Sequence, residues 1–333
     1  MIMRKILFCS LLVILGNIAC EDEARTIPEI SGVQQAEVWV DSRDGKSYDC
    51  IEIGDQIWLA ENLSYFVVEN EILNCRTFGE SYLSQEDFMD NVREPFKEAI
   101  RASGLQDPDG LGLWDRPSMK YPTWVDDAAT LDEVIAQAEA DETFTDEWIR
   151  VFKETRDSLL SVVVENHFAE AEADNGYYSE KYGLLYSYDA ALKAVPSEGG
   201  WRLPEDEDWK KLERYLGMSE EEIAKDNAWR GDIQGVYLKE GSEYSIGFNA
   251  LYGGGKLYVP TYDSNSDDDT YTRQGQNAYF WTSEKLTESD SIPLGMIRSV
   301  AIFNEQILRT TTRIVNDSGQ PTMFSVRLVK DKN

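Results

Sequence analysis

The residue types that most often carry out catalysis are scarce in this chain. His167 is the only histidine, and no serine or cysteine lies near it in a nucleophile pattern. A catalytic triad needs a histidine beside such a nucleophile, and a histidine-rich metal site needs several histidines. The sequence supports neither kind of site, and we interpret His167 as a solvated helix residue.

Acidic residues are abundant, and they leave one catalytic alternative open. Glycoside hydrolysis needs two carboxyl groups, one of which has a raised pKa and acts as a general acid. The chain has 62 aspartates and glutamates, so some of them lie close together in any fold. Abundance does not raise a pKa. We therefore favour a protein that is not an enzyme, with an envelope enzyme of unknown reaction as the alternative.

One acidic segment resembles the start of a calcium-binding loop. Oxygen-bearing side chains follow one another from Asp263 to Asp269. An EF-hand loop needs glycine at its sixth position and glutamate at its twelfth, whereas Asp268 and Gln274 stand there. We interpret Asp107–Gly110 as a turn. The sequence therefore predicts no metal site, and we expect no cofactor.

Aromatic residues gather in the loop-rich stretch between Gly217 and Trp281. Aromatic faces beside amides and a guanidinium group can stack on sugars or form the centre of a protein interface. The predicted ligand-binding residues are three rings and two polar partners: Trp229, Tyr252, Tyr279, Arg230 and Asn249. The alternative is that these rings fill the core beneath long loops.

Residues 1–19 have the layout of a secretory signal. The basic pair Arg4-Lys5 precedes the apolar stretch Ile6–Leu15 and the small residues before Cys20. The apolar stretch is shorter than the roughly 20 residues that span a bilayer. This layout resembles the lipobox of bacterial lipoproteins, which implies a lipidated Cys20 that anchors the chain to a membrane. An ordinary signal peptide with a chance cysteine is the alternative.

Residues 20–36 lack periodicity, and we interpret them as an acidic, hydrated tether. The triplet Glu21-Asp22-Glu23 resembles the surface-export signal of Bacteroidetes lipoproteins, which implies an outer-membrane lipoprotein exposed on the cell surface. A merely polar linker is the alternative. The net charge of -30 argues against nucleic acid as a partner and against direct adsorption to anionic lipid.

Two cysteines are left once Cys9 is assigned to the signal and Cys20 to the lipid anchor. They are Cys50 and Cys75, and the compartment outside the cytoplasm is oxidising. We predict a disulfide between them, with two free thiols as the alternative.

Periodicity predicts strands at both ends of the folded part. Apolar residues alternate from Tyr48 to Leu59 around the turn Gly54-Asp55, which indicates short strands or a hairpin. A helix is predicted from Glu205 to Leu216, ending at Gly217, and a final strand from Phe324 to Val329.

The region between these strands is acidic and predicted to be helical. Thr130 and Thr145 precede apolar stripes and are expected to cap two helices, the second ending at Asn175-Gly176. Pro95 should break or kink an earlier helix over residues 85–102. These helices are interpreted as a helical insertion over residues 76–176, whose stripe is a packing face or, as the alternative, a groove for a partner.

Several separated segments resemble the Fibrobacter succinogenes major paralogous domain. They occur in the order that is typical of that family: Asp44-Gly45-Lys46-Ser47-Tyr48, Ile53-Gly54-Asp55-Gln56-Ile57-Trp58-Leu59-Ala60-Glu61-Asn62-Leu63, Tyr182-Gly183-Leu184-Leu185-Tyr186, Gly200-Trp201-Arg202-Leu203-Pro204, Gly247-Phe248-Asn249-Ala250 and Phe280-Trp281-Thr282-Ser283-Glu284. The resemblance assigns residues 37–75 and 177–333 to this domain. The long helical insertion departs from the family pattern.

The resemblance implies an α+β, C-type-lectin-like fold with a small twisted antiparallel sheet. This fold is shared with formylglycine-generating enzymes, which rely on cysteines near the end of the domain, but no cysteine follows Cys75. The motifs Glu-Pro-Asn, Gln-Pro-Asp and Trp-Asn-Asp of calcium-dependent lectins are also missing. We therefore expect a metal-independent binding or adhesion module for a glycan or an envelope protein. Its rival is a structural component of an envelope complex, with the insertion docked on a partner.

Overall fold

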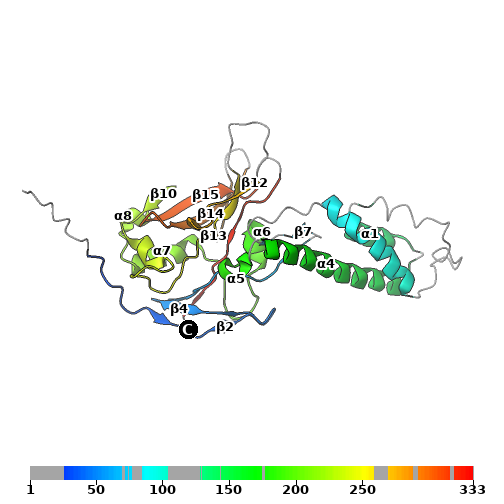
Figure 1. Ribbon diagram of the computed structural model, residues 1–333, viewed down its shortest axis with the longest axis horizontal. Coiled ribbons are helices and arrows are strands. Elements are labelled where there is room, and N and C mark those ends of the chain that lie inside the picture. Colours follow the sequence, from blue (N-terminus) through cyan, green and yellow to red (C-terminus); the bar gives the residue numbers. More distant parts are fainter. Residues whose placement is uncertain are drawn as a thin grey trace, which may run out of the picture.

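The computed structural model describes residues 26–69, 72–73, 75–76, 85–103, 128, 130–142, 144–174, 177–258, 269–287, 292–315 and 319–332. A domain of helices and sheets forms one end of the molecule, and an arm of helices forms the other end (Figure 1). The chain is an α+β protein, which confirms the predicted class. No helix in the described ranges combines the length and the apolar composition that crossing a membrane requires.

The smaller sheet joins the two ends of the folded chain. Its antiparallel strands follow the order β1 (Gln34–Gln35), β4 (Cys50–Ile53), β5 (Gln56–Leu59) and β17 (Val329–Asp331). Ile53 pairs with Gln56, so Gly54-Asp55 forms a two-residue hairpin loop. Gly54 has a φ of 64°, as the first central residue of a type II′ turn requires. The predicted hairpin is therefore confirmed.

The larger sheet contains nine strands in the described part of the chain. Along its main path lie β10 (Ala228–Arg230), β15 (Ile307–Arg313), β14 (Pro293–Ala301), β13 (Asn277–Thr287), β16 (Met323–Ser325), β11 (Gly255–Tyr258) and β12 (Asp269–Thr272). β9 (Leu185–Ser187) pairs with β16, and β8 (Cys75–Arg76) pairs with β9. Two hairpins stand apart: β2 (Trp39–Val40) with β3 (Ser47–Tyr48), and β6 (Val68–Glu69) with β7 (Ile72–Leu73).

Helix α7 (Asp206–Tyr215) packs against both sheets. Glu205 and Asp208 form a capping box at its start, and Gly217 follows its end with a φ of 84°. Trp209 packs against Trp58 of the smaller sheet and Phe280 of the larger one, at 5.1 and 5.6 Å between ring centroids. The predicted helix is confirmed. The described part of the domain also contains shorter helices: α5 (Tyr178–Tyr182), α6 (Tyr188–Lys193), α8 (Glu220–Ile223) and α9 (Gln234–Leu238).

The predicted final strand is in fact two strands. β16 belongs to the larger sheet and β17 to the smaller one, and residues 326–328 cross between them. The crossing is held by backbone hydrogen bonds in which Leu63 and Leu59 donate to the carbonyls of Val326 and Leu328. Residues 323–329 are all buried, Ser325 and Arg327 included, so no exposed residue marks this change of sheet in the sequence.

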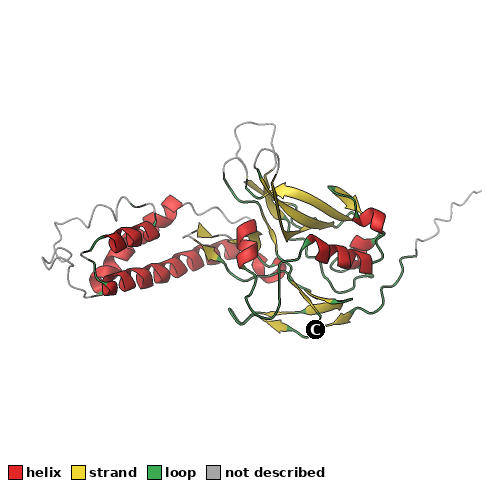
Figure 2. Cartoon of the chain, turned by 180° about the vertical axis from the view of Figure 1, so that it is seen from behind, coloured by secondary structure: helices red, strands yellow, loops and turns green. Residues whose placement is uncertain are grey.

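The helical arm has a hydrophobic core of its own. It consists of α1 (Gln85–Ala102), α3 (Leu131–Ala140) and α4 (Asp146–Asp174), and Figure 2 shows these helices extending to one side of the sheets. Val92, Val134 and Phe152 contribute one buried residue from each helix. Thr130 caps α3 through its side chain, as predicted.

The structure corrects one prediction for the arm and leaves another outside the described ranges. Helix α1 continues through Pro95, which is exposed, so the predicted break is wrong, while a kink at this residue stays a prediction. Asn175 and Gly176, the predicted end of the long helix, lie outside the described residues.

Candidate functional site

The two faces of the larger sheet carry different side chains, and each face contains candidate residues for catalysis or ligand binding. In antiparallel strands, residues that face each other across the ladder lie on the same face, and neighbours along a strand alternate between faces. Phe280, Arg298, Arg309 and Ala228 therefore form one row beneath α7. Tyr279, Ser299, Leu308 and Trp229 form the next row on the opposite face. We call this opposite face the outer face.

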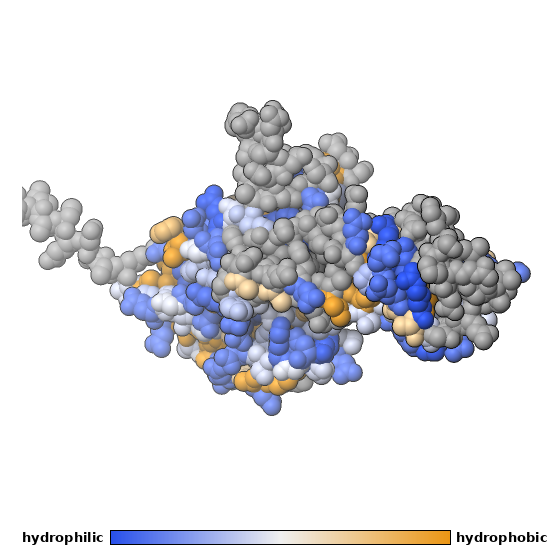
Figure 3. Space-filling model, turned by 45° about the vertical axis from the view of Figure 1, so that its right-hand side comes forward, coloured by the Kyte–Doolittle hydropathy of each residue, from blue (hydrophilic) through white to orange (hydrophobic). Residues whose placement is uncertain are grey.

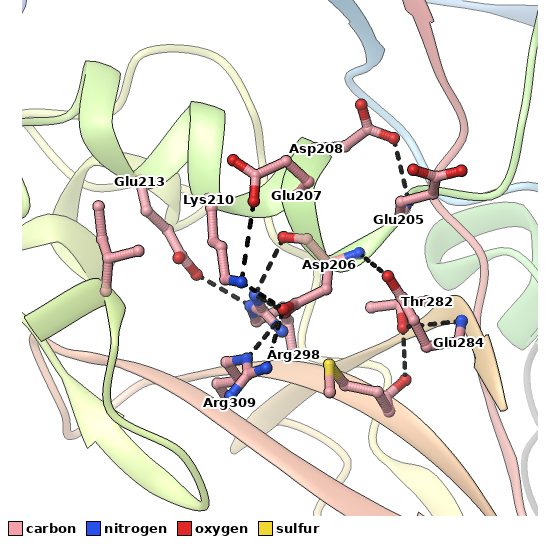
Figure 4. Close-up of polar contacts among 12 residues, drawn as sticks. Glu205, Asp206, Glu207, Asp208, Lys210, Glu213, Thr282, Glu284, Arg298 and Arg309 are labelled. Atoms are coloured by element: carbon pink, nitrogen blue, oxygen red, sulfur yellow. Dashed lines mark hydrogen bonds and ion pairs between the residues drawn. The ribbon is translucent and has the colours of Figure 1, made fainter. Parts of the chain in front are cut away.

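Ion pairs fill the space between α7 and the sheet (Figure 4). Asp206 accepts hydrogen bonds from Arg298 at 2.6 Å and from two nitrogens of Arg309, each at 2.8 Å. Glu213 Oε1 accepts from Arg298 at 2.9 Å and from Arg230 at 2.5 Å. We call these five residues the α7 charge cluster. Because Arg298, Arg230 and Glu213 are fully buried, their charges are compensated mainly by one another.

The electrostatics of this cluster do not suit acid–base catalysis. Burial raises the pKa of Asp206, but the hydrogen bonds and charges of Arg309, Arg298 and Lys210 outweigh it, and the net pKa lies well below the usual range. Asp206 therefore stays ionised at neutral pH and cannot donate a proton as a general acid must. Burial likewise lowers the pKa of Arg230. The ion pairs of the cluster connect α7 to the strands β10, β14 and β15.

Trp229 and Tyr279 are the two predicted site residues that the structure places on one surface. Both lie on the outer face, in the same row, and both rings are half-buried. Three interstrand spacings of about 4.8 Å put their backbones about 14 Å apart. One side of the Tyr279 ring packs on Phe324, with 5.1 Å between centroids, which holds the ring in place.

Arg230 does not belong to this surface. It neighbours Trp229 on β10, so its side chain points to the opposite face, where it is fully buried and bonded to Glu213 and to the Ile223 carbonyl. The prediction that Arg230 is a polar ligand contact is wrong, because its charge is committed to the α7 charge cluster.

Tyr252 is part of the core. It is 9% exposed and packs in the hydrophobic cluster that also contains Trp209 and Phe280. Burial, with a smaller contribution from Glu240, raises the pKa of its hydroxyl to about 12. The prediction of a stacking contact is wrong for this ring, and the alternative that rings fill the core beneath long loops holds for it.

Asn249 has a backbone role away from the two rings. Its φ of 51° is left-handed, a conformation that asparagine adopts more readily than most residues. Its carbonyl accepts a hydrogen bond from Arg327 at 3.1 Å. The structure therefore does not bring Asn249 together with Trp229 and Tyr279.

Polar groups on either side of the row that joins the two rings were missed by the sequence analysis. Asn277 donates to the Ser299 hydroxyl at 3.3 Å, and the hydroxyl of Thr310, on the same face, lies 3.1 Å from the Asn227 side chain. The alternation within residues 277–281 and 307–313 indicated strands. It did not indicate the order and register of these strands, which decide that Asn277 and Thr310 lie on the same face as the two rings. Ser299, between the rings, is fully buried, so Asn277 and Thr310 are the polar groups of this face that could contact a ligand. Two rings flanked by an amide and a hydroxyl can stack on and hydrogen-bond a neutral polar ligand.

The structure also corrects the predicted disulfide. Cys50 has a free, buried thiol that donates to the Tyr48 carbonyl at 3.6 Å. It faces Leu59 across the ladder within the hydrophobic core, so no bridge to Cys75 is formed. Burial raises the pKa of the Cys50 thiol.

The remaining candidates fall mostly outside the described residues. Cys20, Asp107–Gly110 and residues 261–268 are not described, and of His167 only the helical backbone is. In the described part of the chain, no group of three histidine, cysteine, aspartate or glutamate side chains is arranged to hold a metal ion.

Comparison with known families assigns most of the domain. A sequence model of the Fibrobacter succinogenes major domain (Fib_succ_major) matches residues 139–330. The chain belongs to this family. No curated protein and no solved structure matches it. The suspected family is thereby confirmed.

The family match and the three-dimensional domain have different boundaries. The Fib_succ_major match includes α4, which the sequence analysis assigned to the insertion, and it begins after β4 and β5. In the structure β5 pairs with β17 near the end of the matched range. The smaller sheet therefore contains strands from both inside and outside the match.

Segments that resemble the family's motifs in the sequence meet around one buried arginine. The Arg327 guanidinium donates to Asn62 at 2.6 Å and to the Leu59 carbonyl at 3.0 Å, and it lies over the Phe248 ring at 4.6 Å. Burial lowers its pKa. These contacts join the segments Ala60–Leu63 and Gly247–Ala250 to the last crossing of the chain. The contacts around Arg327 are therefore scaffold.

Proposed function

We propose that this Fib_succ_major protein is a metal-independent binding module for a glycan, and that its ligand lies along the outer face between Trp229 and Tyr279. The observation that carries the proposal is the row Trp229–Leu308–Ser299–Tyr279, which presents two half-buried rings on one face. Rings that are held in place before a ligand binds lose little conformational freedom on binding.

The composition of this face favours a neutral ligand over a charged one. Its half-buried side chains are aromatic, aliphatic, hydroxyl and amide groups, and the neighbouring arginines Arg298 and Arg309 point to the other face. A sugar ring offers apolar C–H faces for the aromatic rings and hydroxyls for Asn277 and Thr310. The separation of about 14 Å, three strand spacings, suits an extended chain of sugars better than a single one.

The proposal includes the location and the finer fold. Cys20 would carry the lipid, and Glu21-Asp22-Glu23 would direct the protein to the outer surface of the outer membrane. We also infer a C-type-lectin-like fold, supported by the antiparallel four-stranded sheet, the helices α6 and α7 and the loop-rich stretch between Gly217 and Gly255, in which α8, β10 and α9 are all short.

A glycan array tests the proposal. The chain should bind particular glycans saturably, with and without chelator, and the double variant Trp229→Ala/Tyr279→Ala should lose this binding. Tyr252→Ala is the control, because it removes a ring from the core and not from the outer face. Absence of glycan binding, or binding that chelator abolishes, would contradict the proposal.

A second candidate function rests on the helical arm. The arm has its own core and extends away from the sheets, so it can reach a partner without disturbing the domain (Figure 1). In this alternative the protein is an assembly component of an envelope complex. An envelope protein that co-purifies stoichiometrically with the chain, in the absence of glycan binding, would favour it.

A further inference from the structure

The turn between β14 and β15 exposes two adjacent apolar side chains. Phe303 is 91% exposed, the highest value among the large hydrophobic residues in the described ranges, and Ile302 is 40% exposed. Apolar surface in water is unfavourable, and a tip of this kind is expected where it contacts another apolar phase. Figure 3 shows hydrophobic surface at the left end of the folded domain, opposite the arm.

Hydrogen bonds hold this tip in a fixed shape. The Ile302 amide donates to the Gln276 carbonyl at 2.8 Å, and Lys239 Nζ donates to the Ile302 carbonyl at 3.0 Å. Asn304 accepts from the Gln306 amide at 2.9 Å. The exposure of Phe303 is therefore a property of an ordered turn, from which the ring points into solvent.

The start of the folded chain lies beside the same short helix as the tip. The amide of Gly235 in α9 donates to the Glu305 carbonyl at 2.7 Å, which joins α9 to the turn. The Tyr237 hydroxyl, also in α9, donates to the Pro28 carbonyl at 2.8 Å. Ile27 packs against the core near this point. The chain thus enters the domain beside α9, the helix that also contacts the turn carrying Phe303.

The length of chain before this point limits how the domain can sit. Thr26 follows Cys20 by six residues, which span about 20 Å when fully extended. A lipid on Cys20 therefore keeps the surface around Pro28 close to the bilayer. In Figure 1 the described start of the chain lies at the left and the arm at the right, so the arm is directed away from the anchored end.

We propose that the Ile302–Phe303 tip inserts into the lipid interface beside the anchor and fixes the orientation of the domain on the membrane. The proposal rests on the lipid anchor at Cys20 that is part of the proposed function. Because the anchor already holds the tip near the bilayer, a small apolar contact is sufficient. The net charge of -30 gives no attraction to anionic lipid, so the contact is apolar and fits a zwitterionic surface.

Photocrosslinking in vesicles tests this contact. The full-length lipidated chain, with the photoreactive analogue benzoylphenylalanine in place of Phe303, is reconstituted in phosphatidylcholine vesicles, separated by flotation and irradiated. The matched control has the analogue at Leu286, which is 41% exposed and lies on β13 away from the turn. We expect lipid adducts from position 303, at least tenfold more than from position 286, and unchanged in high salt.

The same experiment separates failure of the tip from failure of the anchor. Floating protein without a lipid adduct at position 303, with equal adducts at both positions, or with adducts only between protein chains would overturn the proposed insertion while leaving the anchor in place. Protein that does not float would contradict the anchor, and with it the insertion that depends on it.

Discussion

At the scale of single residues, Glu213 is the carboxylate on which the buried part of the α7 charge cluster depends. One of its oxygens accepts hydrogen bonds from both Arg230 and Arg298. Its other oxygen, together with Arg230 Nε and Arg298 Nη1, has no hydrogen-bond partner among the described residues. If Glu213 is lost, Arg298 keeps its ion pair with Asp206, whereas Arg230 keeps only its hydrogen bond to the Ile223 carbonyl.

Replacing Glu213 with alanine should destabilise the fold strongly. Glu213→Ala leaves two buried guanidinium groups without their shared carboxylate, and breaking a buried pair in this way costs about 3 to 5 kcal/mol. Urea unfolding of the purified domain measures the loss. Glu207→Ala is the control, because Glu207 is largely exposed and its ion pairs with Lys210 and Arg214 should contribute at most about 1 kcal/mol. Similar losses for both variants would contradict the buried role of Glu213.

The Cys50 thiol should react slowly in the folded protein. Burial both shields it and raises its pKa, so that little thiolate is available to an alkylating reagent. We expect labelling of Cys50 by iodoacetamide to be at least a hundredfold slower in the native protein than in urea, as followed by mass spectrometry of the peptide. Rapid native labelling would show that the core around Cys50 opens.

Residue types alone could predict part of this site and not the rest. Trp229 and Arg230 are neighbours in the sequence, and both were expected to contact a ligand. Because side chains alternate along a strand, one lies on the outer face and the other in the core. Which of the two faces is covered depends on α7, and this cannot be read from a short strand whose position in the sheet is unknown.

At the scale of elements, local signals were the most reliable. The end of the helix at Gly217, the turn at Gly54-Asp55 and the cap at Thr130 depend on a few neighbouring residues, and all three were predicted correctly. The split between β16 and β17 was missed because it depends on contacts with segments more than a hundred residues away. The strand propensities of single residues do not include contacts between distant segments.

The cap at Thr130 gives a prediction for the arm. The Thr130 hydroxyl accepts a hydrogen bond from the Glu133 amide at 3.0 Å, so Thr130→Ala should cost about 1 kcal/mol. Because the arm has its own core, faster hydrogen exchange should appear in α3 and α4 and not in the larger sheet. The control is Gln137→Ala, an exposed change in the same helix. Equal acceleration in the sheet would mean that the arm and the domain open together.

At the scale of the whole molecule, the proposals assign different roles to three regions. The chain enters beside α9, which also contacts the turn carrying the Ile302–Phe303 tip. The outer face of the larger sheet carries the proposed glycan site, and the helical arm extends from the other end (Figure 1). In the proposed orientation the lipid anchor and the tip hold one end at the membrane, and the arm is directed away from it. A ligand on the outer face is then accessible from outside the cell.

The central claim is that Trp229 and Tyr279 contact one extended glycan, and calorimetric titration tests it most directly. With the best glycan from the array, Trp229→Ala and Tyr279→Ala should each weaken binding at least tenfold, which corresponds to about 1.4 kcal/mol. A glycan too short to reach both rings should respond to only one of the two substitutions. Tyr252→Ala should lose stability but keep the affinity at a temperature where it is folded. Unchanged affinity in both outer-face variants would contradict the account.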